Sequence, residues 1–251
     1  MIGLAIMIKF CLFCRGSFKS QYTKQKFCSE KCANRYNLNN LNKVVLPKKS
    51  EALAEFIGIF LGDGELRSHY IAIYLNSISD NKYIEYVKCL CTKLFKGATV
   101  TCNKKKHENC VRIQISSVIV VRFLLKMGLK PKKIPEWINS RNTYIKACIK
   151  GLFDTEGSIS FKQYKTKNGI SLYKQLNFRN ANMNLIRFVR DKLKLFGFRP
   201  TMSLRRSLYI STHDDIDLFR KKIGFGNDKL IKRSLISNWS DFIIWRGAGV
   251  V

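Results

Sequence analysis

Two apolar stretches of the sequence each end in a carboxylate beside a glycine. In FIGIFLGDGEL, residues 56–66, the acid is Asp63, and in CIKGLFDTEGSI, residues 148–159, it is Glu156, 93 residues further along. Packing alone does not require an acid at the end of a buried helix, and a single acid there is most often a solvated helix terminus. Because the arrangement occurs twice, we predict that the two carboxylates act together.

Small residues recur at every fourth position of both stretches. They are Ala54, Gly58 and Gly62 in the first stretch, and Ala147, Gly151 and Thr155 in the second. Residues at this spacing share one face of a helix, and small side chains there let two backbones approach closely. We therefore expect the two helices to pack along these faces, which brings Asp63 and Glu156 out at the same end. Gly64 and Gly157 follow the acids, and we expect both in the left-handed conformation that terminates many helices.

Two carboxylates at the negative ends of two helix dipoles repel each other, and divalent cations would remove that cost. Oxygen ligands of this kind suit Mg²⁺. Two such ions between the carboxylates and a phosphate form a site for phosphodiester hydrolysis, in which one ion activates water and the other stabilises the leaving oxygen. Asp63 and Glu156 are therefore the candidate catalytic residues and the candidate Mg²⁺ ligands.

The charge of the chain indicates the same class of substrate. There are 46 Lys and Arg residues against 17 Asp and Glu, which gives a formal net charge of +29. Such an excess indicates a polyanionic partner, with nucleic acid first and an anionic membrane surface second. No segment approaches the roughly 20 apolar residues of a membrane span. The opening MIGLAIMIKF also lacks the basic region and the cleavage site of a signal peptide.

Four of the nine cysteines form the pattern C-x2-C-x13-C-x3-C, at Cys11, Cys14, Cys28 and Cys32. Two close pairs joined by a short loop can surround one structural Zn²⁺ with four thiolates, and a block this short needs the metal in order to fold. We expect Cys89 and Cys148, which lie in apolar runs, to be core residues. An odd cysteine count without a secretory signal favours a reducing compartment. This would be the cytoplasm of a prokaryote or of a virus-infected cell, near the nucleoid, or the matrix of an organelle.

The rest of the chain consists of two copies of one unit. Each copy begins with the acid-bearing helix and continues with two strands, an amphipathic helix, two more strands and a final helix. The predicted fold class is therefore α+β, a duplicated αββαββα unit with a small N-terminal zinc-binding module. The predicted divisions are the zinc module at 1–43, a linker at 44–50, the first repeat at 51–128, a second linker at 129–142, the second repeat at 143–235, and a tail at 236–251.

Both acid-bearing segments resemble the signature of the LAGLIDADG homing endonucleases, in their single-chain form with two motifs. Gly58, Asp63 and Gly64 match the third, eighth and ninth signature positions, and Gly151, Asp154, Glu156 and Gly157 match the third, sixth, eighth and ninth. The first copy departs at the sixth position, where Leu61 replaces the usual acid. The resemblance extends over about residues 51–235, and the cysteine block resembles a small treble-clef zinc finger.

The resemblance implies a pseudo-twofold molecule whose antiparallel sheets form a saddle over DNA. It further implies a monomer that uses two or more Mg²⁺ ions and cuts both strands of a long target, leaving short 3′ overhangs. The family also carries a basic residue near the scissile phosphate, after the last helix of each half. Aligning MGLKPKK with IGFGNDK assigns this role to Lys133 and Lys229.

The strand patterns carry a polar face that suits the major groove. In VRIQIS, Val111, Ile113 and Ile115 are expected to point into the core, while Arg112 and Gln114 point outward. Arg, Gln and Asn can read purine edges, and acids are nearly absent from these strands. The predicted DNA contacts are Arg67, Tyr74, Asn76, Lys105, Arg112, Gln114, Lys162, Gln175, Asn177, Arg179 and Arg205. In the last strand pair, Met202 and Leu204 are expected to face the core.

The predicted function is thus an intron-encoded, site-specific double-strand DNA endonuclease. Two alternatives use the same scaffold, namely a maturase that binds its own intron RNA and a transcription regulator that binds DNA without cutting it. The presence of both acids argues against the regulator. An intein is a weaker alternative, because the sequence has no terminal His-Asn and no splicing blocks on either side.

Overall fold

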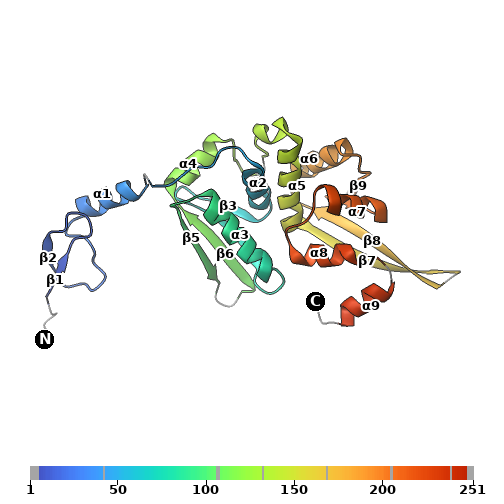
Figure 1. The fold of residues 1–251 in the computed structure, drawn as a ribbon, viewed down its shortest axis with the longest axis horizontal. Helices are drawn as coiled ribbons and strands as arrows, with labels where there is room; N and C mark the ends of the chain where they lie inside the picture. The colour runs from blue at the N-terminus through green and yellow to red at the C-terminus, as the bar shows by residue number, and fades with distance from the viewer. Residues whose placement is uncertain are drawn as a thin grey trace.

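The computed structural model describes residues 6–41, 43–105, 108–131, 133–167, 169–203, 206–237 and 239–247. Two similar halves lie side by side, and the N-terminal block lies apart from them at one end of the molecule (Figure 1). The first half contains α2 (Glu51–Asp63), β3 (Gly64–Leu66), β4 (Tyr70–Asn76), α3 (Asn81–Leu94), β5 (Thr99–Lys104), β6 (Cys110–Ser116) and α4 (Val118–Lys126). The second contains α5 (Asn142–Glu156), β7 (Gly157–Thr166), β8 (Gly169–Arg179), α6 (Met183–Leu195), β9 (Thr201–Ser203), β10 (Ser207–Ile210) and α7 (His213–Lys222). The predicted αββαββα duplication is confirmed.

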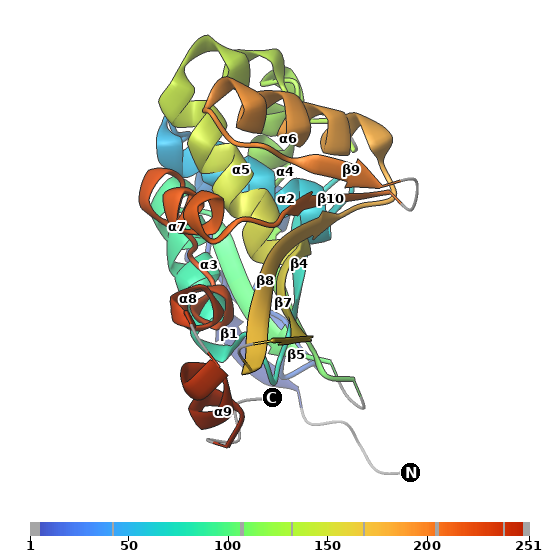
Figure 2. The ribbon, with the colours of Figure 1, turned by 90° about the vertical axis from the view of Figure 1, so that its right-hand side faces the viewer.

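The two halves have the same sheet topology. The strand orders are β3-β4-β6-β5 and β7-β8-β10-β9, with antiparallel neighbours throughout. Ile71 and Ile73 of β4 pair with Ile115 and Ile113 of β6, and all four are buried against the helices. Figure 2 shows α3, α7 and α8 on one side of β4, β7 and β8. Each sheet therefore has one face in the core, while polar residues alternate onto the other face.

Helices α2 and α5 form the most extensive contact between the halves and lie side by side in the centre of the molecule (Figure 1). A Cβ added at Gly58 would lie 2.1 Å from the carbonyl oxygen of Cys148, and one at Gly151 would lie 2.3 Å from that of Glu55. A Cβ at Gly62 would meet the Thr155 side chain. The prediction that the small-residue faces pack against each other is confirmed, because only glycine permits this backbone approach.

The predicted left-handed conformation of the glycines after the acids is wrong. Gly64 has φ −97° and ψ 148°, and Gly157 has φ −85° and ψ 153°, so both are extended and each begins a strand directly. Glycine is needed there for space, because a Cβ would lie 2.3 Å from the carbonyl oxygen of Phe60 in one case and of Phe153 in the other. The change from helix to strand without a turn keeps each acid at the start of a sheet.

Two predictions of burial are also wrong. Met202 is 40% exposed, because β9 is a three-residue strand at the edge of its sheet. Cys89 is exposed, whereas Cys91 and Cys148 are buried, because α3 turns Cys91 rather than Cys89 towards the core. Leu204 lies outside the described residues.

The remaining elements flank the two halves. The N-terminal block contains β1 (Met7–Phe10), β2 (Ser17–Ser20) and α1 (Glu30–Leu41), the 3-10 helix η1 (Glu136–Ser140) precedes α5, and α8 (Asp228–Leu235) and α9 (Trp239–Gly247) follow α7. Within the described ranges, no helix has the length and apolar character that a bilayer crossing requires.

A buried lysine of β8 fastens the end of α8. Lys174 is 1% exposed, and its Nζ donates hydrogen bonds of 2.8 Å to the carbonyl of Ser234 and 3.0 Å to that of Ile236. The carbonyls at a helix C-terminus lack partners within the helix, so the ammonium group satisfies them. Helix α9 in turn packs Phe242 against Phe161 of β7, with ring centroids 5.0 Å apart and the ring planes tilted by 48°. The C-terminal helices are therefore attached to the second sheet.

Replacing Gly58 or Gly151 with leucine should prevent stable folding. Overpacking a core typically costs about 1–3 kcal/mol, and here the obstacle is backbone, which cannot rotate away as a side chain can. We expect a loss at or above the top of that range, measured as a lower urea midpoint or as insoluble protein. Ala52→Leu is the matched control, because Ala52 is an exposed residue of α2. Wild-type stability of both glycine variants would show that α2 and α5 do not touch along this face.

Candidate active site and nucleic-acid interface

The two acids emerge at the same end of the packed helix pair. Asp63 is the last residue of α2 and Glu156 is the last residue of α5. The Glu156 Cγ lies 3.2 Å from where a Cβ of Gly62 would stand, so the glycine next to Asp63 makes room for the other acid. The structure therefore brings together the two residues that the sequence proposed as a catalytic pair.

Burial destabilises the charged forms of both acids, and repulsion by other carboxylates adds to this effect at Asp63. The pKa of Asp63 rises from 3.8 to about 7, first through burial and then through the charges of Glu156 and Asp80. Burial also raises the pKa of Glu156, while a hydrogen bond of 2.8 Å from the Asn180 amide opposes that rise. The two acids thus have different neighbours, a second carboxylate for Asp63 and an amide donor for Glu156.

The donor set at this position fits a divalent cation. Within the described part of the chain, neither Asp63 nor Glu156 forms an ion pair with Lys, Arg or His. Half-buried carboxylates that repel each other gain more from a bound cation than solvated ones do, and hard oxygen donors favour Mg²⁺, Mn²⁺ or Ca²⁺. Asp63 and Glu156 are the residues that would hold such an ion.

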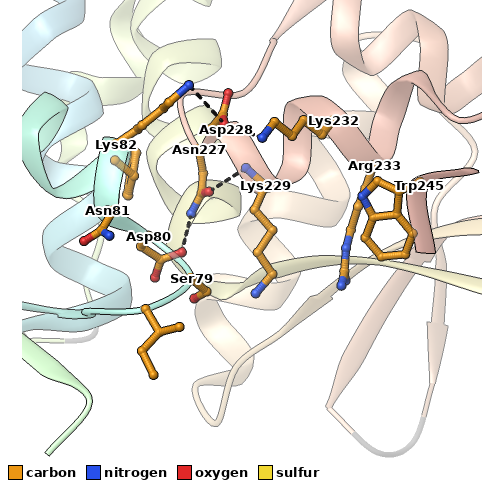
Figure 3. A pocket seen from close by; sticks show the side chains of 12 residues that line it. Ser79, Asp80, Asn81, Lys82, Asn227, Asp228, Lys229, Lys232, Arg233 and Trp245 are labelled. Carbon is orange, nitrogen blue, oxygen red and sulfur yellow. Dashed lines mark hydrogen bonds and ion pairs between the residues drawn. The ribbon is translucent and has the colours of Figure 1, made fainter. Parts of the chain in front are cut away.

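A chain of hydrogen bonds joins the two halves beside the acids. The carboxylate of Asp154 accepts from the backbone N–H groups of Gly226 at 2.8 Å and Asn227 at 3.0 Å. The Asn227 side-chain amide donates to the Asp80 carboxylate at 3.1 Å (Figure 3). It also donates to the Asp154 carbonyl at 3.2 Å. Asn227 is the N-cap of α8, so the helix start connects the second half to Asp80 of the first. Leu61 occupies the position in α2 that Asp154 occupies in α5. In the described part of the first half, that position therefore has no carboxylate to hold the start of a following helix.

An ion pair crosses the helix interface one turn further from the acids. Lys150 of α5 lies 2.6 Å from the carboxylate of Glu55 on α2, and the two side chains are only 20% and 11% exposed. The hydroxyl of Tyr86 donates to the same carboxylate at 2.5 Å. The Tyr83 hydroxyl lies among these charges, is buried, and has no hydrogen-bond partner within the described residues. Removing either charge would leave the other buried and uncompensated.

The two lysines aligned by sequence occupy opposite ends of the molecule. Lys229 lines a cavity of about 170 Å³ together with Asp80, whose charge acts on Asp63. Lys229 and Arg233 extend from α8 in the same direction (Figure 3). Lys133 instead lines a hollow with Lys49, which precedes the N-terminus of α2. The prediction that Lys133 acts near the acids is therefore wrong, because the chain after α4 turns into the linker to α5, whereas the chain after α7 starts α8.

In the first half, the predicted DNA contacts lie together around one acid. Tyr74 and Arg112 are cross-strand partners, so they share the open face of the sheet. The carboxylate of Glu65 accepts from Tyr74 and from Arg67, both at 2.6 Å. The Lys105 Nζ lies 5.0 Å from the centre of the Tyr74 ring. Gln114 lies on the same face, where it donates to Ser116 at 2.6 Å. Glu65 belongs to β3, which was not among the strands predicted from the sequence, and its two hydrogen bonds hold the Tyr and Arg side chains in place.

In the second half, the predicted contacts also share the open face. Asn177 donates at 3.0 Å to Ser160 on the neighbouring strand β7, and Gln175 donates at 3.2 Å to Ser211, which directly follows β10. Arg179 and Lys162 are exposed on the same long hairpin, β7–β8. Arg205 lies outside the described residues. Asn76 of β4 differs from the others, because its side-chain oxygen accepts from the backbone N–H groups of Ile78 and Ser79 and so holds a turn.

The four N-terminal cysteines converge on one point. The sulfur atoms of Cys11, Cys14, Cys28 and Cys32 all lie within 4.8 Å of one another. Cys28 lies 3.6 Å from Cys14 and 3.5 Å from Cys32. Sulfurs at two corners of a zinc tetrahedron are about 3.8 Å apart, given a Zn–S bond of about 2.3 Å. Hydrogen bonds to Cys32 and Cys14 raise the pKa of Cys28 to about 12, so metal binding must displace protons here.

Known structures and a family model agree with this architecture. A LAGLIDADG-like domain matches residues 143–224, the second half of the molecule. Mesophilic variants of the homing endonuclease I-DmoI share 21% identity with a TM-score of 0.50, covering 69% of this chain and 95% of theirs. The homing endonuclease I-LtrWI bound to target DNA shares 12% identity with a TM-score of 0.52, covering 80% of this chain and 93% of its own. The chain has the LAGLIDADG homing endonuclease fold.

Curated relatives come from Methanocaldococcus jannaschii. The replication factor C small subunit is 26% identical over 192 residues, which is 74% of this chain and 10% of that protein. Reverse gyrase is 28% identical over 188 residues, which is 72% of this chain and 10% of that protein. An uncharacterized protein is 22% identical over 216 residues, covering 83% of this chain and 72% of its own length. The chain thus spans about a tenth of the length of the replication factor C small subunit and of reverse gyrase.

Three polar residues of the site were not predicted from the sequence. Asn180 contacts Glu156, the charge of Asp80 raises the pKa of Asp63, and Asn227 joins Asp80 to α5. Asp80 and Asn227 each stand immediately before a helix, where a capping residue is the ordinary interpretation. Sequence offered no further signal, because the contact between Asp80 and Asn227 joins residues 147 positions apart.

The free energy of unfolding of the metal-free protein should fall as the pH rises from about 4 to about 7. The folded-state pKa of Asp63 is raised from 3.8 to about 7, so the folded chain holds more protons than the unfolded chain within this window. Asp63→Asn should reduce the slope, and Asp154, whose pKa burial also raises to about 7, should account for much of what remains. Added Mg²⁺ should also reduce the slope, because it binds the charged carboxylate of Asp63. Urea unfolding followed by tryptophan fluorescence measures this, with the exposed Glu85→Gln as control. An equal slope in Asp63→Asn and the wild type would contradict the buried acid pair.

The purified chain should contain about one tightly bound zinc ion, because four converging thiolates form a closed tetrahedral site. Elemental analysis of protein prepared without chelator measures the zinc content. The double variant Cys14→Ser, Cys28→Ser should lose the metal, whereas the exposed Cys89→Ser should keep it. Zinc retained in the double variant would rule out this site.

Proposed function

We propose that this chain is a site-specific double-strand DNA endonuclease that hydrolyses phosphodiester bonds at Asp63 and Glu156 with divalent metal ions. The observation that supports this most directly is the meeting of two carboxylates, one from each half, at the shared end of α2 and α5. Each acid directly precedes the first strand of a sheet whose open face is polar. Because one chain supplies both acids, we propose that it acts as a monomer.

The residues around the acids would divide the work of the reaction. Bound Mg²⁺ or a similar ion would supply an activated water and neutralise the leaving oxygen. The Asn180 amide orients the Glu156 carboxylate by its hydrogen bond. Partial burial keeps bulk water away from Asp63, which strengthens each charge interaction at the phosphate. Lys229, on the acid side of the molecule, is the remaining candidate for the basic residue near the scissile phosphate.

Duplex DNA is the proposed substrate because the open sheet faces and the charge suit it. Arg112, Gln114, Gln175 and Asn177 are of the types that read base edges in the major groove. The first two lie on β6 and the other two on β8, each an inner strand of its sheet. The similar structures include I-DmoI in complex with DNA and Ca and in complex with DNA and Mn. Those complexes support a duplex substrate and a divalent ion for this chain.

The N-terminal block is proposed to be a zinc finger that adds phosphate contacts. Its exposed basic residues include Lys19, Lys24, Lys26, Lys31 and Arg35. Each contact with a phosphate releases counterions and so adds to the affinity for duplex DNA in a salt-dependent way. All nine cysteines are free of disulfide bonds, so we also propose that the protein works in a reducing compartment.

Asp63→Asn and Glu156→Gln should each abolish cleavage while leaving DNA binding largely intact. Each change removes a metal-binding charge from the site but leaves the open sheet faces untouched. The measurement is Mg²⁺- or Mn²⁺-dependent cleavage of a randomised plasmid library, with the cut ends sequenced and binding measured on the recovered target.

The exposed acid Glu136 lies at the far end of the molecule, so Glu136→Gln is the control and should cut normally. Strong double-strand cleavage by either active-site variant would overturn the assignment. Sequence-specific binding without cleavage by the wild type would instead favour a regulator.

A further inference from the structure

A hollow lined by lysines lies at the opposite end of the central helices from the acids. Its volume is about 630 Å³, and it lies between the end of α4, the linker into η1 and the start of α2. The charged residues that line it are Lys49, Lys126, Lys130, Lys133 and Glu136, and the apolar ones include Met127, Ile134, Pro135 and Trp137.

A duplex on the open sheet faces would not reach this hollow. Lys49 immediately precedes Ser50, the N-cap of α2, whereas Asp63 ends the same helix. A helix of 13 residues spans roughly 18–20 Å at 1.5 Å per residue. The bodies of α2 and α5 therefore separate the hollow from the acids, and the lysines there are free to serve a second ligand.

Among the described residues, the four lysines that line the hollow have no acidic partners to neutralise their charge. All four are exposed, and none forms an ion pair with the described acids. Glu136 is the one acid that lines the hollow within the described part of the chain. Several like charges around one concavity raise the local potential and attract an anion. Phosphate groups suit such a site, because each ammonium can donate several hydrogen bonds to their oxygens.

The shape of the hollow discriminates among anionic ligands. A duplex presents a convex surface with its bases stacked inside, so it would touch the lysines but leave the hollow empty. An unpaired strand can place a base in the hollow against Trp137 and Pro135, with its phosphates on the surrounding lysines. The volume lies within the range of about 300–1,000 Å³ that small-molecule pockets occupy.

We propose that this hollow binds single-stranded nucleic acid, at a site separate from the one proposed for duplex cleavage. The inference does not depend on the proposed endonuclease activity, because no residue of the acid site contributes to the hollow. The protein would thereby hold a duplex on its sheets and an unpaired strand at its other end at the same time.

The test uses the full chain with saturating unlabelled duplex DNA, so that the open sheet faces are occupied. Labelled oligouridine and oligothymidine of equal length serve as probes, and fluorescence anisotropy is measured across a salt series. The test variant is Lys49→Ala, Lys126→Ala, Lys130→Ala. The matched control is Lys93→Ala, Lys96→Ala, Lys194→Ala, which removes the same charge from exposed residues of α3, of the turn after it and of α6. Duplex binding is measured separately for each protein.

We expect the test variant to bind the single strands about tenfold more weakly and to lose about two units of salt slope, at roughly 0.7 per phosphate contact. The control variant should keep wild-type affinity, and duplex binding should not change in either. A preference for oligouridine would identify RNA as the source of the strand. Equal binding of both probes would show that the site recognises phosphates and bases without distinguishing RNA from DNA. Equal losses in the test and control variants would reduce the effect to bulk charge and overturn the proposal.

The location is tested independently through Trp137. A base that enters the hollow should quench the fluorescence of Trp137, and Trp137→Phe should remove most of that quenching while keeping the edge-on contact with Tyr144. Quenching that is unchanged in Trp137→Phe would place the strand elsewhere and overturn the proposal.

Discussion

The rest of the structure depends on the backbone contact between α2 and α5. Gly58 and Gly151 lie so close to the opposite helix that a single added carbon would strike a carbonyl oxygen at 2.1 Å or 2.3 Å. This contact fixes the separation of the two helix ends, and hence the separation of Asp63 and Glu156. It also fixes how the two sheets sit relative to each other, because each sheet begins at the residue after its acid.

The close approach has an electrostatic cost that the surrounding residues only partly offset. Helix ends that meet bring together two carboxylates and two negative dipole ends. Asn180 stabilises the charge of Glu156, but Asp80 adds a further negative charge beside Asp63. The hydrogen bond from Asn227 holds Asp80 in that position instead of letting it turn into solvent. The folded chain therefore maintains an unfavourable charge arrangement, and such arrangements are typical of sites that bind metal.

The two halves have diverged around a common core. The second half carries an acid at position 154, and this acid anchors the start of α8, whereas the first half has Leu61 and continues into a linker. As a result, Lys229 stays on the side of the acids while Lys133 lies with Lys49 at the other end. The large positive charge is thus distributed over at least two separate surfaces of the molecule. A pseudo-twofold backbone does not imply equivalent functional residues at equivalent positions.

The sequence alone determined the repeat, the order of elements, the acid pair and the cysteine cluster. Each of these is a local pattern: the fourfold spacing of small residues, the alternation along VRIQIS, and the four cysteines of one short block. Local spacing dictates which residues share a helix face or a strand face, so such predictions survive folding. Gly64 shows that even a short-range pattern can mislead, because glycine is needed there to avoid a clash and not to adopt the left-handed conformation.

Only the tertiary structure decided that Asn227 joins Asp80, that Lys174 caps α8, and that Lys133 lies far from Asp63. These contacts join residues that are distant in the chain, and they depend on the angles at which whole elements pack, which no local pattern encodes.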